Sequence, residues 1–350
     1  MMEMNTEQTL HSTRQTDIDI AKGIGIILVV WAHAYGPLLH YITQFHMPFF
    51  FFVSGLLCAS ADVSGKDYLL RKCKSLLLPF WYWNILFFPV FFILFYWKNW
   101  SVDTFVKGIA GIVFTLDKVP FLGATWFLPA LFWTSVTVHF GIRIFRKYRF
   151  CDACILTGGI ASCVLGFSIT FPYRISRTLI CSLFYVCGYL YRKYLKDAIG
   201  DRIKNISAVV GGLIFIIIAS FNSVSLGNNE YQYKIAFIVG ALSATAFILR
   251  VSRWLSKSMS IRRLSNHLAY IGRHSMCIVI WHLLAFRVTI ILQILMLHAD
   301  IKSIIAFPVY DASGIWWLLY LVAGIYISLG WQYVLEHNPF SSLMRRIHMI

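Results

Sequence analysis

The chain has 350 residues, of which 59% are hydrophobic and only 13% are charged. A soluble protein carries about 25% charged residues, so this composition excludes an ordinary soluble domain. The mean hydropathy of +0.69 and long apolar runs such as LIFIIIA predict an all-α polytopic membrane protein instead. The formal net charge of +16 does not indicate nucleic-acid binding, because the basic residues punctuate the apolar runs and form no single patch.

In chain order, the polar residues 1–16 come first, and we expect them to form a disordered cytoplasmic N-terminus. One membrane domain of about ten helices follows over residues 17–340, and residues 341–350 form a predicted cytoplasmic C-terminal tail. The ten predicted spans cover residues 18–39, 45–60, 76–97, 124–145, 151–171, 178–194, 207–224, 234–250, 272–297 and 314–336.

Two segments of this pattern are unusual. The second span is short and contains Pro48 and Gly55, which is typical of a broken or re-entrant segment. The apolar stretch 105–115 is too short to span, so we place it at the membrane surface. The first span follows a polar segment with Asp17 and Asp19, and no A-x-A site ends it, so we expect it to remain uncleaved.

The lysines and arginines predict the orientation of the chain. With the N-terminus in the cytoplasm, 22 of the 31 fall in inner segments, 6 in outer loops and three near or inside spans. The positive-inside rule then places both termini in the cytoplasm, and we expect the chain to reside in the bacterial inner membrane. All eight cysteines fall in spans or inner loops, so we expect no disulfides, and Cys151-x-x-Cys154 favours packing over a metal site.

The first span carries an ionisable residue near each end, in KGIGIILVVWAH. Lys22 and His33 are eleven residues apart, so they share one helix face and lie about 16 Å apart along the axis. Lys22 has an alternative role as a snorkelling lysine paired with Asp19. His33 has an alternative role in helix packing, but an intramembrane histidine on the same face as Lys22 favours function.

Acyl transfer is one task that the chemistry of these two side chains suits. A lysine can hold a phosphate, and an imidazole can accept a proton near neutral pH. Transfer of an acyl group from coenzyme A needs both, because its phosphates stay at the membrane surface while its thioester reaches inward. The spacing alone does not select that substrate.

Four motifs add a family resemblance. They are DIAKGIGIILVVWAH, FHMPFFFFVSGLL, ATWFLPALF and IGRHSMCIVIWH, in this order along the chain. The chain resembles the acyltransferase-3 family of integral membrane acyltransferases, especially its fucose 4-O-acetylase-like branch. The core of this family has ten spans. Lysine stands at position 22 where many members have arginine.

The resemblance implies roles for the residues that match these motifs. His33 would be the catalytic histidine and Lys22 its partner. The family's Arg-x-x-Arg motif for the acyl donor corresponds to RKCK, in which Arg71 aligns and Lys74 replaces the second arginine. Lys22, Arg71, Lys72 and Lys74 are therefore the predicted acyl-CoA-binding residues. The alternative for the loop cluster is ordinary positive-inside charge.

Further polar residues are weaker candidates for an acceptor site or pore. They are His46, Trp126, His282 and Arg287. His46 and Trp126 also suit the membrane interface, and Arg287, like Arg174 and Arg177, suits contact with lipid headgroups. His282 lies inside the ninth predicted span, which favours a functional role. Ser54 and Gly55 indicate close helix packing, because no G-x-S-x-G motif surrounds the serine.

No Asp or Glu lies deep in a predicted span, which argues against a proton-driven transporter and leaves His33 without an obvious carboxylate partner. A carbonyl, a hydroxyl or a second histidine would have to orient it. No metal is expected. The resemblance implies O-acetylation, with acetyl-CoA as co-substrate and a sugar hydroxyl of a surface glycan or its lipid-linked precursor as acceptor. The alternatives are another donor such as succinyl-CoA, or a transporter or flippase of a lipid-linked sugar.

Overall fold

The computed structural model describes residues 16–58, 63–96, 101–196, 198, 200–339 and 341–346. Apart from Thr16, the predicted disordered N-terminus lies outside the described residues, and so do residues 347–350 of the predicted tail. The α-helices are α2 (Thr16–His33), α3 (Leu39–Thr43), α4 (His46–Leu56), α5 (Gly65–Lys72), α6 (Leu78–Tyr96), α7 (Val102–Val113), α8 (Phe127–Phe145), α9 (Cys151–Ser168), α10 (Ile175–Leu190), α11 (Asp201–Phe221), α12 (Lys234–Lys257), α13 (Arg262–Arg273), α14 (Ser275–Leu297), α15 (Trp316–His337) and α16 (Ser341–Arg346).

Short irregular elements join these helices. Two π-helical segments, η1 (Cys73–Leu77) and η4 (Tyr191–Leu195), extend α5 and α10, and two 3₁₀ segments are η3 (Pro120–Trp126) and η5 (Ile301–Ile305). The described strands are β1 (Val224–Ser225) and β2 (Glu230–Tyr231), which pair antiparallel. The chain is thus all-α, as the sequence predicts.

Seven helical segments of the described chain are long and apolar enough to cross a membrane. They coincide with seven of the ten predicted spans, and the chain is an integral membrane protein. The count of about ten is not confirmed. The remaining three predicted spans coincide with α2, which carries three charged residues, and with α4 and α10, which have 11 and 16 residues. The predicted surface stretch falls on the 12-residue helix α7.

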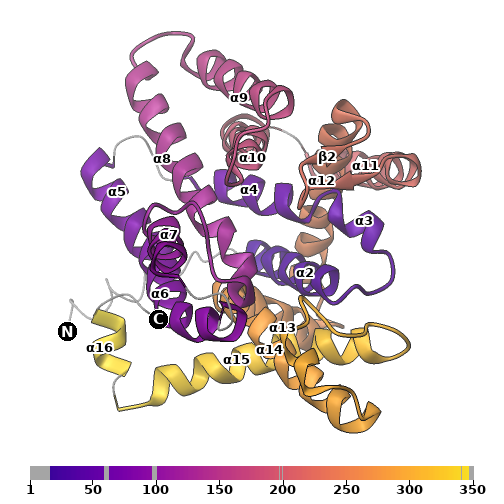
Figure 1. The fold of residues 1–350 in the computed structure, drawn as a ribbon. Coiled ribbons are helices and arrows are strands. Elements are labelled where there is room, and N and C mark those ends of the chain that lie inside the picture. Colours follow the sequence, from indigo (N-terminus) through magenta and orange to yellow (C-terminus); the bar gives the residue numbers. More distant parts are fainter. Residues whose placement is uncertain are drawn as a thin grey trace, which may run out of the picture.

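Helix α2 lies in the middle of Figure 1, between α4 and the group α13 to α15. It approaches α13 so closely that the two backbones touch. A Cβ atom on Gly23 would lie 2.1 Å from the Leu268 carbonyl oxygen, and one on Gly272 would lie 1.8 Å from the Asp19 carbonyl oxygen. Only glycine fits at either position, so this pair fixes the depth and rotation of α2 against α13.

A second glycine pair joins α4 to α10. A Cβ atom on Gly55 would lie 1.9 Å from the Tyr185 carbonyl oxygen, and one on Gly188 would lie 2.0 Å from the Phe52 carbonyl oxygen. The predicted packing role of Gly55 is therefore confirmed. The short helix α4 is buried on nearly every side, which explains how 11 residues hold a fixed place in the protein.

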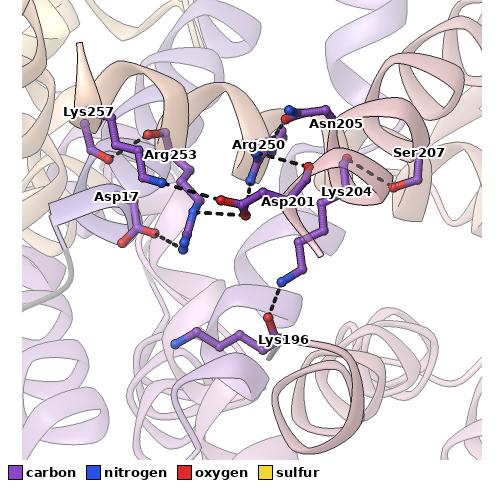
Figure 2. Close-up of polar contacts among 10 residues, drawn as sticks. Asp17, Lys196, Asp201, Lys204, Asn205, Ser207, Arg250, Arg253 and Lys257 are labelled. Atoms are coloured by element: carbon purple, nitrogen blue, oxygen red, sulfur yellow. Dashed lines mark hydrogen bonds and ion pairs between the residues drawn. The ribbon is translucent and has the colours of Figure 1, made fainter. Parts of the chain in front are cut away.

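An ionic cluster anchors the start of α2 (Figure 2). The Asp201 carboxylate, at the start of α11, accepts a hydrogen bond from Arg250 at 3.1 Å and pairs with Arg253 and Lys257 at 3.9 and 3.6 Å. Arg253 also lies 3.9 Å from the Asp17 carboxylate. The cluster joins the ends of α2, α11 and α12, where each pair is partly exposed and contributes at most about 1 kcal/mol.

The glycine contact between α2 and α13 generates a prediction about stability. Gly272→Ala should destabilise the protein by about 1–3 kcal/mol, because the new Cβ must push the two helices apart. Gly158→Ala is the matched control, since a Cβ added at this glycine of α9 would have no atom within 4 Å. Thermal unfolding of the purified protein in detergent measures the difference, and equal melting temperatures for the two variants would contradict the tight contact.

Candidate functional site

The last residue of α2, His33, meets His282 of α14. The distance between His33 Nδ1 and His282 Nε2 is 3.1 Å, and the ring centroids lie 5.0 Å apart. His282 is completely buried, and its Nδ1 lies 2.6 Å from the Ile278 carbonyl oxygen. The structure therefore brings together two predicted site residues that are 249 positions apart in the sequence.

The hydrogen bonds define the tautomers of a neutral histidine pair. The Ile278 carbonyl can only accept, so His282 donates from Nδ1 and its Nε2 carries the lone pair. His33 must then donate from its own Nδ1, which leaves Nε2 of His33 as the proton-accepting nitrogen. The second histidine thus supplies the orientation that a carboxylate supplies in many enzymes.

A cavity of about 330 Å³ lies against His33. It is enclosed by α2, α3, α4, η3, the starts of α8 and α10, the β1–β2 turn and Val279 of α14. Its polar lining includes His46, Trp126 and Arg177. His46 Nδ1 donates to the Ile42 carbonyl at 2.9 Å, and Arg177 donates to the Gly227 carbonyl. Two of the predicted acceptor residues, His46 and Trp126, therefore line the same cavity as His33.

A larger groove of about 990 Å³ lies along the opposite side of α14. Arg71 and Lys74, from α5 and η1, line it together with Arg273 at the end of α13. Asp67 and Glu336 are also part of its lining. Trp83 and Trp281 lie farther along α6 and α14 from these charges, with ring centroids 4.4 Å apart. The groove thus has a charged, mainly cationic end and an aromatic end.

Three predicted site residues lie outside both hollows. The Lys22 ammonium pairs with the Asp19 carboxylate at 3.2 Å, as its alternative role predicts, and the Lys72 ammonium lies 5.6 Å from the Tyr68 ring centroid. The Arg287 guanidinium donates to the carbonyls of Ile304, Ala306 and Pro308. Its hydrogen bonds hold the segment between α14 and α15, which is a structural role.

Sequence reasoning misses Arg273 as a groove residue. In the sequence it belongs to the inner-loop charge, and only its place within the motif IGRHSMCIVIWH distinguishes it from other basic residues. The sequence favours a lipid contact for Arg177, yet this residue lines the His33 cavity. Among the described residues, no group of three or more His, Cys, Asp or Glu side chains has the arrangement of a metal site.

Comparison with known families identifies the class of the protein. The acyltransferase domain family matches residues 15–337, which is nearly the whole chain. The chain belongs to this family. No curated protein and no solved structure matches it. It is therefore an integral membrane acyltransferase, with an acyl donor and an acceptor as its substrates.

The tautomer assignment generates a prediction about His282. His282→Leu should lower kcat for acyl transfer about 100-fold, because His33 loses the acceptor that orients its ring. His282→Gln should retain more activity, since its amide can donate to the Ile278 carbonyl and accept from His33 Nδ1. Steady-state kinetics of the two variants measure the difference. Equal losses would show that His282 contributes only packing.

Proposed function

We propose that the chain is an O-acyltransferase that moves an acetyl group from acetyl-CoA to a sugar hydroxyl of a surface glycan or its lipid-linked precursor. The observation that carries the proposal is the His33–His282 pair, which lies beside a cavity and is separated from a cationic groove by α14. The resemblance to the fucose 4-O-acetylase-like branch supports the acetyl group and the sugar. The proposed location is the bacterial inner membrane with both termini in the cytoplasm.

The donor is proposed to occupy the groove. Arg71, Lys74 and Arg273 would bind the phosphates of coenzyme A, two of them as two-pronged guanidinium groups. Helix α14 rises about 9 Å from its first residue, Ser275, to Trp281, so the pantetheine arm would extend along the groove toward the aromatic rings. Lys22 and Lys72, which pair with Asp19 and contact Tyr68, would contribute positive charge without lining the groove.

The acceptor is proposed to occupy the cavity. In direct transfer, Nε2 of His33 takes the proton of the sugar hydroxyl as its oxygen attacks the thioester carbonyl, the C–O bond forms and the C–S bond breaks. The coenzyme A thiolate leaves and recovers the proton. In the covalent alternative, the same nitrogen attacks the thioester carbonyl, a C–N bond forms, the C–S bond breaks and the thiolate leaves. The sugar oxygen then attacks the acetyl carbon, the C–N bond breaks, and the freed nitrogen takes the hydroxyl proton and passes it to the thiolate. His282 stabilises His33 in the required tautomer in both cases.

The catalytic role is tested by His33→Ala. Acetyl transfer should fall by at least about 100-fold, because the proton-accepting nitrogen is lost. The control is His267→Ala, which removes an exposed histidine hydrogen-bonded to Tyr326 on the outside of the helix bundle. Transfer of radiolabelled acetyl groups to membrane glycans measures activity, and gel filtration checks the fold. Near-normal transfer by His33→Ala would contradict the proposal.

The donor site is tested by neutralising one groove cation at a time. Arg71→Gln and Arg273→Gln should each raise KM for acetyl-CoA about tenfold, or about 1.4 kcal/mol, with little change in KM for the acceptor. Lys72→Gln is the matched comparison from the same cluster and should raise this KM less, because Lys72 does not line the groove. An equal effect of all three substitutions would assign the cluster to general surface charge.

A further inference from the structure

A third hollow, separate from the groove and the cavity described above, lies between α8, α9 and α10. We call it the lipid-side channel. Its volume is about 570 Å³, and its lining is mostly apolar. It extends from Trp126, the last residue of η3, along α8 to Phe145, which corresponds to about 28 Å of helix. This length is close to the thickness of the hydrocarbon core of a membrane, about 30 Å.

Small residues set the width of the channel. A Cβ atom on Gly158 would meet no atom within 4 Å, so this exposed face of α9 borders empty space. Gly159 and Gly141 bring α9 near to α10 and α8, since a Cβ on each would lie 3.2 and 3.1 Å from Val186 and Ile155. The channel is thus long, narrow and apolar, which suits a hydrocarbon chain.

One end of the channel carries positive charge. Lys118 and Arg174 line this end, and Asp117 is the one carboxylate among the described lining residues. Asp117 lies 3.8 Å from the Arg174 guanidinium and is more than half exposed. Burial lowers the pKa of Lys118 to about 8, and the neighbouring Arg174 and Arg177 add to this effect. Two cations, Lys118 and Arg174, face one exposed carboxylate, so this end has an excess of positive charge that suits a phosphate.

The charged end of the channel adjoins the His33 cavity. Trp126 lines both hollows. Arg177, one helical turn after Arg174, lines the cavity and lies 5.8 Å from the Trp126 ring centroid. A ligand with its phosphate at Lys118 and Arg174 would therefore have its headgroup beside Trp126, at the entrance to the cavity.

We propose that the lipid-side channel binds the hydrocarbon chain of a lipid-linked sugar, with its phosphate at Lys118 and Arg174 and its sugar in the His33 cavity. The role of the sugar rests on the proposed function. A membrane phospholipid also has a hydrocarbon chain and a phosphate, so it is the competing ligand. The connection through Trp126 favours the lipid-linked sugar, because it directs the headgroup toward His33.

The test measures lipid binding without any acyl donor. Native mass spectrometry of the full chain in detergent should detect one undecaprenyl phosphate per protein. Gly158→Phe should weaken binding at least tenfold by filling the channel, and so should the double variant Lys118→Gln, Arg174→Gln. Gly330→Phe is the matched control, since Gly330 is also an exposed helical glycine where an added Cβ would have no atom within 4 Å.

Competing lipids identify the occupant. Neither phosphatidylglycerol nor inorganic phosphate should displace undecaprenyl phosphate at equal concentration. Displacement by phosphatidylglycerol would show that the channel is a general phospholipid site and would overturn the proposal. Displacement by inorganic phosphate would show that the hydrocarbon chain contributes nothing to binding, which would also overturn it. Equal binding by Gly158→Phe and Gly330→Phe would also overturn the proposal. The binding measurement needs no acyl donor, so it is independent of catalysis. If the protein binds the lipid but transfers no acetyl group, the proposed function is contradicted and the lipid site is not.

Discussion

The backbone contact between α2 and α13 is the constraint on which the site depends. Gly23 and Gly272 let the two helices touch, and any side chain at either position would separate them. Helix α2 carries His33 at its far end, ten residues beyond Gly23. A rotation of α2 by a fraction of a turn at the glycine contact would move the His33 ring away from His282, so the packing at one end of the helix determines the position of His33 at the other.

A pair of histidines is a suitable solution at this depth. An ionised carboxylate buried in an apolar environment is costly, and it would need its own compensating partners. Two neutral imidazoles joined by one hydrogen bond place no net charge there. The chain of donors runs from His33 to His282 to the Ile278 carbonyl, which is part of the α14 backbone. The orientation of His33 is therefore set by a helix, which is more rigid than a loop.

Much of the fold can be predicted from sequence because apolar runs mark helices directly. The positions of α6, α8, α9, α11, α12, α14 and α15 follow from that signal. The amphipathic helix α13 falls in a predicted loop, since its exposed face is basic and its buried face is short. Helix α4 coincides with the predicted unusual span, and its 11 residues show why hydrophobicity alone does not settle the number of crossings.

The site is less predictable, and the reason is the separation of its parts along the chain. The helical period places Lys22 on one face with His33 and also one turn from Asp19, so it does not decide between the two roles of Lys22. The structure pairs Lys22 with Asp19 at 3.2 Å. His282 is a candidate in the sequence because it is a histidine within a span. Its contact with His33 depends on the packing of α14 against α2, and no local pattern encodes a contact across 249 residues.

The two compartments of the site meet at consecutive residues of α14. Trp281 lines the groove, whereas His282 contacts His33. Each residue turns the helix by 100°, so Met276, Cys277, Ile280 and Trp281 form one face while Val279 and His282 form the opposite one. With the donor in the groove, as proposed, its thioester would have to pass around α14 to reach His33.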